Sequence, residues 1–175
     1  MKRKMIGVLA AVCLITGITA CGSDKASQDD ATKTAKTTKS TEAKDEVTKN
    51  AMTATIEQNG AKVTMVADAK GDTIVQLTQT GTIDTSSYSD EDKANVQESI
   101  EKAKETYSAL DGVEYSTEDK DGVITETIKM DLTGDKLQAI IDSGALPVEG
   151  DTDKITELSV SQTKKSLEDA GWTIE

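Results

Sequence analysis

The fold is decided by residues 52–67, which read MTATIEQNGAKVTMVA. Apolar side chains alternate with polar ones on both sides of an Asn-Gly pair: Met52, Ala54 and Ile56 before it, and Val63, Met65 and Ala67 after it. Asn59-Gly60 is a strong signal for a type I′ turn, because both central residues of that turn need positive φ. The stretch therefore predicts an antiparallel hairpin whose apolar side chains lie on one face.

The pattern continues on the C-terminal side of this hairpin. Lys70-Gly71-Asp72 predicts a second turn, and the apolar residues from Ile74 onward predict a third strand that reaches Ile83. Ser89 then offers a helix N-cap, with acidic residues in the first turn, where the helix dipole favours them. The helix it begins has one apolar face at steps of three and four and ends at Asp111-Gly112; that face comprises Val96, Ile100, Ala103, Tyr107 and Leu110.

A second hairpin and two further helices complete the chain. Residues 113–115 and 124–130 alternate around Asp121-Gly122, and its acidic side chains are expected to face mostly water, namely Glu114, Glu118 and Glu126. Residues 132–145 predict a short helix that buries Leu137, Ile140 and Ile141, and Pro147 ends it. The last helix is expected over residues 160–170, with Ser159 and Gln162 as a capping box, Gly171 at C′ and Trp172 packing back.

The predicted order is therefore βββαββαα. Antiparallel hairpins with helices inserted between and after them indicate an α+β fold, with about five antiparallel strands and the helices packed on one face of the sheet. Residues 51–175 are enough for one compact domain and too few for a two-lobed binding protein.

The N-terminus carries the features of a secretory signal. Lys2-Arg3-Lys4 precedes an apolar stretch over residues 5–18, and residues 18–22, ITACG, look like a bacterial lipobox. The apolar stretch is too short for a comfortable transmembrane span, so a cleaved leader fits better than an anchor helix. We expect residues 1–20 to be removed and the Cys21 thiol to carry two acyl chains. The alternative is an ordinary secretory signal in which Cys21 is incidental.

A polar tether is predicted to follow Cys21. Residues 22–50 hold six lysines and six acidic residues with almost no apolar side chain, so they cannot bury enough surface to offset their ordering entropy. As a coil, the segment from Cys21 to residue 50 has a typical span of roughly 30 Å. Because Cys13 lies in the leader, processing leaves Cys21 alone, which excludes a disulfide or a cysteine metal site in the mature protein.

The chain beyond residue 52 resembles the small YehR-like bacterial lipoproteins, which are described as a domain of unknown function. The resemblance rests on the lipobox, the hairpin over residues 54–66, the Tyr107 helix with Leu110-Asp111-Gly112-Val113 after it, and the segments of the C-terminal tail from Gly150 to Trp172. It implies an envelope lipoprotein with an α+β fold. It brings no catalytic residues and no mechanism.

Composition limits the chemistry that the protein can perform. The chain has no histidine, no Gly-x-Ser-x-Gly motif and no phosphate-binding glycine loop, so the usual apparatus of acyl transfer and zinc hydrolysis is missing. Hydrolysis by paired carboxylates stays open because acids are plentiful, although sugars usually need aromatic platforms and the chain offers few: Tyr88, Tyr107, Tyr115 and Trp172. Tyr107 and Trp172 are predicted to be structural. Tyr88 and Tyr115 are candidates for a recognition surface, although the inward strand position of Tyr115 favours the core.

Charge limits the partners. Residues 51–175 carry 26 acidic residues and 11 lysines, a net charge of −15, so nucleic acid and anionic headgroups would be repelled. A basic protein surface or a cation is a better match, and the simplest alternative is that the acidity keeps the domain soluble. Glu149, Asp151 and Asp153 alternate after Pro147 and are weak candidates for a Ca²⁺ site, because they lack the spacing of a calcium loop.

We therefore expect a non-catalytic lipoprotein without a cofactor. It would be a monomer held by lipid on Cys21 at the outer face of a cell membrane, with a Gram-positive host favoured and a protein of the envelope as its partner. The alternatives are a small hydrolase that uses paired carboxylates and a Ca²⁺-dependent binding module. A hydrolase would need two buried acids that face each other in one polar cleft.

Overall fold

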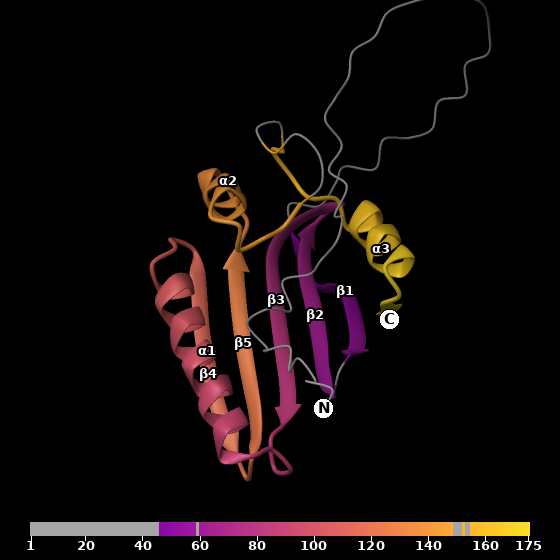
Figure 1. Cartoon of the computed structure of the whole chain (residues 1–175). Helices are drawn as coiled ribbons and strands as arrows, with labels where there is room; N and C mark the ends of the chain where they lie inside the picture. The colour runs from indigo at the N-terminus through magenta and orange to yellow at the C-terminus, as the bar shows by residue number, and fades with distance from the viewer. Residues whose placement is uncertain (1–45, 59, 149–151, 153–154) are drawn as a thin grey trace, which may run out of the picture.

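The computed structural model describes residues 46–58, 60–148, 152 and 155–175. In this part of the chain six strands form one antiparallel sheet in the order β4-β5-β3-β2-β1-β6, with three helices beside it (Figure 1). The strands are β1 (Val47–Gln58), β2 (Ala61–Lys70), β3 (Thr73–Asp84), β4 (Val113–Lys120), β5 (Val123–Asp131) and β6 (Thr173–Ile174). The helices are α1 (Asp90–Ser108), α2 (Asp135–Asp142) and α3 (Val160–Asp169). The α+β class and the order of elements are confirmed.

The first hairpin has the predicted register. Gln58 pairs with Ala61, so the connection between β1 and β2 has two residues. Gly60 has a φ of 82°, as the second position of a type I′ turn requires, and Asn59 lies outside the described residues. Met52 and Ala54 on β1, and Met65 on β2, are fully buried, as the alternation predicts.

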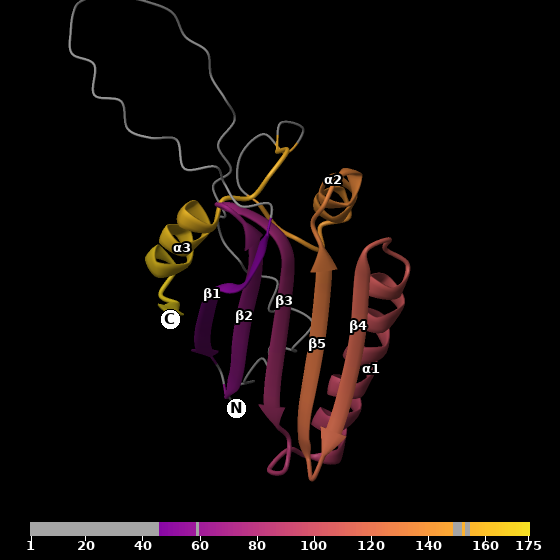
Figure 2. The ribbon, with the colours of Figure 1, turned by 180° about the vertical axis from the view of Figure 1, so that it is seen from behind.

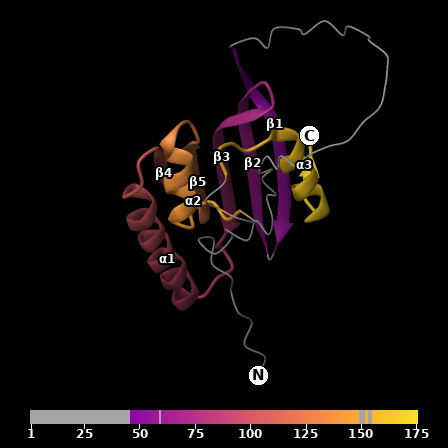
Figure 3. The same cartoon turned by 90° about the horizontal axis from the view of Figure 1, so that it is seen from above.

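All three helices cover the same face of the sheet. The main apolar cluster joins the buried side chains of the strands to those of α1, α2 and α3, for example Met65 with Tyr107, Ile140 and Leu167. A smaller cluster under the first half of α1 contains Ile83, Val96, Ile100 and Ile124. Seen from above, the helices lie along one side of the strands (Figure 3), and the view from behind shows the strands of the other face (Figure 2). The sheet thus has one packed face and one open face.

The helix ends form as the sequence predicts. The Ser89 and Ser159 hydroxyls cap α1 and α3 by accepting from the backbone N–H of Asp92 and Gln162, each at 3.2 Å. At the end of α3, Gly171 has a φ of +88°, its N–H donates to the Glu168 carbonyl and the Trp172 N–H donates to the Leu167 carbonyl. This is the Schellman arrangement, and it turns Trp172 back into the core, where it is 7% exposed.

Asp72 ties the start of α3 to the turn between β2 and β3. Its carboxylate accepts hydrogen bonds from the Ser159 hydroxyl and from the backbone N–H of Ser161, at 2.5 and 3.0 Å. The hydrogen bond from Ser159, followed by those from Ser161, holds the pKa of Asp72 below its ordinary value although partial burial opposes this. The clamp sets where α3 runs and therefore where β6, which follows it, meets β1.

The structure differs from the sequence expectations in three places. β6 adds a sixth strand, which a run of two residues is too short to reveal. β1 begins at Val47, so residues 47–50, assigned to the tether, form the exposed start of that strand. The expectation that Glu126 faces water is wrong: it points inward between Ile124 and Ile128 and is 3% exposed.

Leu167 offers a test of how α3 is held. It is fully buried, and replacing it by alanine leaves a cavity between α3 and the sheet. We expect Leu167→Ala to lower the free energy of unfolding by about 2–5 kcal/mol in urea titrations. Glu168→Ala, at the exposed next position, serves as the control and is expected to change it little. Equal stability of Leu167→Ala and the wild type would contradict the packing described.

Candidate functional site

The site residues predicted from sequence lie outside the described part of the chain. This holds for Cys21 and for Glu149, Asp151 and Asp153. Within the described residues, no three His, Cys, Asp or Glu side chains gather in a way that could hold a metal ion. No helix among them combines the length and apolar character needed to cross a membrane.

The aromatic side chains mostly serve the core. Tyr107 and Tyr115 stack with their ring centroids 5.7 Å apart, and Trp172 is buried beside α3, so the prediction that these three are structural is confirmed. Tyr88 is half-buried and packs against the smaller apolar cluster under α1. The aromatic residues therefore form no exposed platform within the described domain.

Glu126 is a carboxyl group buried under α1. It lies on β5 at an inward position, and its Oε1 is 2.6 Å from the hydroxyl oxygen of Tyr115 on β4. Burial raises the pKa of Glu126 above its ordinary 4.5, and the hydrogen bond with Tyr115 opposes this only in part. Burial and the neighbouring Glu126 also raise the pKa of Tyr115, so its hydroxyl keeps its proton. Alternation alone, read strictly from Ile124 to Met130, would have placed Glu126 inside.

The geometry around Tyr115 explains how the buried acid is accommodated. The Tyr115 hydroxyl also lies 3.3 Å from the backbone carbonyl of Ile100 in α1, and a phenol has one proton for two acceptors. If Glu126 is protonated, its own O–H donates to Tyr115, and Tyr115 donates to Ile100. Every group is then satisfied without a buried charge. Glu126 therefore fits the packed layer as a neutral acid that links β5, β4 and α1.

Asp68 is the second buried acid, and it is held as an anion. It is 6% exposed on the open face of β2, where its carboxylate accepts hydrogen bonds from Lys49 Nζ at 2.6 Å, Asn50 N at 2.9 Å and Gln76 Nε2 at 3.2 Å. Burial would raise the pKa of Asp68, but the hydrogen bonds from Lys49 and Asn50 outweigh it and lower the pKa. The partners come from β1 and β3, the two strands that flank β2, so the sequence neighbours of Asp68 alone do not reveal that it is buried.

The hydrogen bonds of Asp68 stabilise a bulge in β1. The pairing of β1 with β2 shifts between Thr48 and Met52, and Asn50 in this bulge has a φ of 52°. Asp68 binds the backbone N–H that the bulge leaves without a ladder partner. It thereby fixes the first residues of β1, where the domain continues from the N-terminal segment.

The two buried acids do not share a site. Asp68 lies on the open face of the sheet, whereas Glu126 lies on the packed face beneath α1. Each is occupied by partners from within the protein: Lys49 and Asn50 for Asp68, and Tyr115 for Glu126. They therefore do not form the facing pair that a carboxylate hydrolase requires.

The open face carries a complete row of hydroxyl side chains. Strand pairing places one hydroxyl residue on each of the six strands, side by side across the sheet, and none of them is buried. The row runs from β6 to β4 through Thr173, Thr55, Thr64, Thr80, Thr127 and Ser116. Threonine at every second position of a strand can be read from the sequence. The row, however, depends on strand order: β5 pairs with β4, its predicted hairpin partner, and also with β3, which the sequence does not predict.

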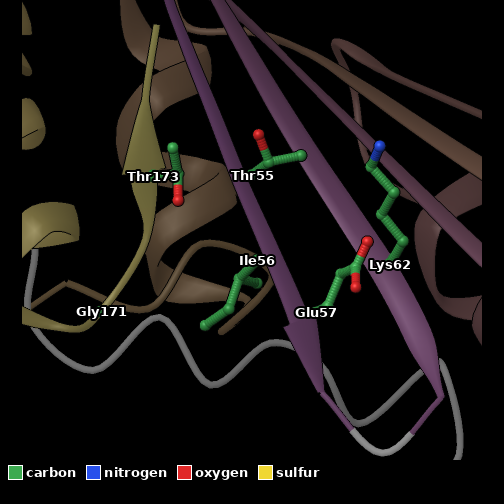
Figure 4. Close-up of a pocket in the computed structure, with 6 residues that line it drawn as sticks. All are labelled: Thr55, Ile56, Glu57, Lys62, Gly171 and Thr173. Carbon is green, nitrogen blue, oxygen red and sulfur yellow. The ribbon is translucent and has the colours of Figure 1, made fainter.

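A hollow of about 400 Å³ opens at the β6 end of this row. Its lining includes the first two hydroxyl residues of the row, Thr173 and Thr55, and the cross-strand neighbours Glu57 and Lys62 (Figure 4). Ile56 and Gly171 complete the wall. Glu57 and Lys62 are both exposed. The hollow therefore offers a carboxylate, an ammonium group and two hydroxyls within one small space.

The raised pKa of buried Glu126 predicts how the stability of the protein depends on pH. Glu126 has a raised pKa in the folded protein, so the folded state holds a proton that the unfolded state loses above about pH 4.5. The free energy of unfolding of the wild type, minus that of Glu126→Gln, should thus be greatest below pH 4.5. As the pH rises it should fall, in total by about 1.4 kcal/mol for each unit by which the folded pKa of Glu126 exceeds the unfolded pKa. Urea titrations of both proteins at several pH values measure this difference in the free energy of unfolding. A difference that does not vary with pH would contradict the buried neutral acid, and Glu118→Gln on the exposed side of β4 is the control.

Asp68 gives the opposite dependence. Its pKa is lowered in the folded state, so its contribution is present above pH 3.8 and is lost as the pH falls through the folded pKa. We expect Asp68→Asn to lower the free energy of unfolding by roughly 1–3 kcal/mol at neutral pH. This loss should shrink toward zero below pH 3.8 in denaturant titrations. An undiminished loss in acid would show that Asp68 does not act as an anion.

Comparison with known structures agrees with the fold. The NMR structure of the E. coli YehR protein matches with a TM-score of 0.58 and 20% sequence identity, over 75% of this chain and 92% of that one. An NMR structure of a protein from Streptococcus pneumoniae TIGR4 matches with a TM-score of 0.47 and 14% identity, over 88% of this chain and 100% of that one. No curated protein matches the sequence.

The family assignment comes from the sequence itself. Residues 50–173 match the family model described as "Protein of unknown function (DUF1307)". These residues make up more than half of the chain and include nearly all of the sheet and its helices. The expected resemblance to YehR is confirmed by the structural match. The chain belongs to the DUF1307 family of proteins of unknown function.

Proposed function

We propose that this protein is a lipid-anchored, non-catalytic binding module on the outer face of a cell membrane. The observation that carries the anchor is the sequence around Cys21, in which an apolar stretch of leader length ends at Ile18-Thr19-Ala20-Cys21. Two acyl chains on one thiol hold a domain stably at a membrane, because each buried methylene contributes about 0.8 kcal/mol. The acidic domain would then stand off the bilayer on a polar tether.

The arrangement of the domain supports binding over catalysis. The packed face is filled by helices, and the open face presents hydroxyls, with a hollow at its β6 edge. An open, solvated surface of this kind can contact an extended partner, whereas acid-base chemistry needs groups in a closed cleft. Asp68 and Glu126, which lie on opposite faces with internal partners, do not favour the hydrolase alternative.

The anchor is tested by labelling cells with an alkyne-bearing fatty acid. We expect the wild type to be labelled and to sediment with membranes, and Cys21→Ala to lose both properties because the acceptor thiol is gone. Cys13→Ala is a matched control, since it removes the other cysteine of the chain from inside the leader, and it should label like the wild type. A mature protein that retains residues 1–20, or labelling of Cys21→Ala at the wild-type level, would contradict the proposal.

A further inference from the structure

We propose that the open face of the sheet binds an extended, uncharged glycan that lies across the strands along the hydroxyl row. One sugar unit would occupy the hollow at the β1–β6 end. This inference rests on the proposed binding function and names its ligand class. It does not depend on the lipid anchor.

The hydroxyl row provides the hydrogen-bonding groups. Thr55, Thr64, Thr80 and Thr127 are half-buried, and within the described residues their hydroxyls make no hydrogen bond to other side chains. Each hydroxyl is one donor and two acceptors, which matches the alternating donors and acceptors of sugar hydroxyls. Neighbouring strands lie about 4.8 Å apart, which is close to the length of one sugar unit in an extended β-linked chain. Successive units can therefore meet successive strands.

Charge selects an uncharged partner. The hydroxyl row and the two flanking rows together carry four acids and two lysines: Glu57, Glu114, Glu118, Glu175, Lys62 and Lys129. Four acids and two lysines give these three rows two net negative charges, whereas residues 51–175 carry −15. Lys129 and Glu114 also neutralise each other at 3.2 Å. An anionic polymer would be repelled by the domain as a whole, and a cationic one would find stronger sites away from this face.

The centre of the face is free of charge. The side chains that β2 and β3 present there are three threonines and one valine: Thr64, Val66, Thr78 and Thr80. Val66 and the threonine methyl groups provide apolar contacts for the carbon-bound hydrogens of a sugar ring, between hydroxyls that bind its polar edge. Threonine also suits strands for its own sake, so the inference rests on the neutral charge and the hollow as much as on the residue type.

The hollow lies at the β6 end of the hydroxyl row, where a bound glycan chain would begin. At about 400 Å³ it lies within the size range of small-ligand pockets. Glu57 and Lys62 line it, and they form no ion pair with each other among the described residues, so both remain available to sugar hydroxyls. Thr55 and Thr173 continue from its wall into the row. A chain bound across the strands would thus start in the hollow and leave along the sheet.

The test is a titration of the full chain, purified in detergent, with a soluble hexamer of β-linked N-acetylglucosamine. Two-dimensional amide NMR spectra should show saturable shifts at Thr64, Thr80 and Thr127. Because the face offers hydroxyls without an aromatic ring, a weak affinity in the millimolar range is expected. Shifts that map to α1 instead, or no shifts at millimolar hexamer, would overturn the inference.

Matched variants make the test specific. Thr80→Val removes one hydroxyl but keeps the β-branched shape, and it should weaken binding about three- to tenfold with an unchanged melting temperature. Thr117→Val is the control, because Thr117 is exposed on β4 outside the open face, opposite Glu126, and should bind like the wild type. Equal affinity for Thr80→Val and wild type would overturn the inference. If the hexamer does not bind while Cys21 is still lipidated, the anchor stands and the glycan assignment falls.

Discussion

The structure depends on the burial of one face of a single antiparallel sheet. Side chains along a strand alternate between the two faces, so the residues that send Met52 and Met65 into the core also send Thr55 and Thr64 to the opposite surface. A shift of one residue in register would expose the core and bury the threonines, which makes the register strongly specified. The packed face and the hydroxyl row are therefore two results of one constraint.

Two acids depart from this simple division, and each does so in a different charge state. Glu126 enters the apolar layer, where burial raises its pKa and Tyr115 joins it to α1. Asp68 is buried on the opposite face, where hydrogen bonds from Lys49 and Asn50 outweigh the effect of burial and keep it ionised. Glu126 adds a polar link between β5, β4 and α1 to the apolar packing that already joins them, and Asp68 holds the bulged start of β1. The two carboxyls therefore act as structural ties.

The sequence predicted the elements better than their arrangement. Hairpins at Gly60 and Asp121-Gly122, the cap at Ser89 and the turn at Gly171 are local, so their residues are enough to predict them. β6 was missed because its two residues are too few to form a pattern and their pairing with β1 depends on the position of α3, which precedes β6 and is held by Asp72. The hydroxyl row was missed for a related reason: it needs β3 to pair with β5 across the intervening α1 and β4, and no local pattern states that order. Glu126 was placed wrongly because its chemical type was weighed above its position in the alternation.

The open face is the working surface in this interpretation, and photo-crosslinking in living cells tests it most directly. A photoreactive residue at position 80 lies at the centre of the open face, and one at position 101 lies on the exposed side of α1. Adducts should form from position 80 and be largely absent from position 101. Adducts from position 101 alone, with none from position 80, would show that the helical side meets the partner and would contradict the function proposed for the sheet.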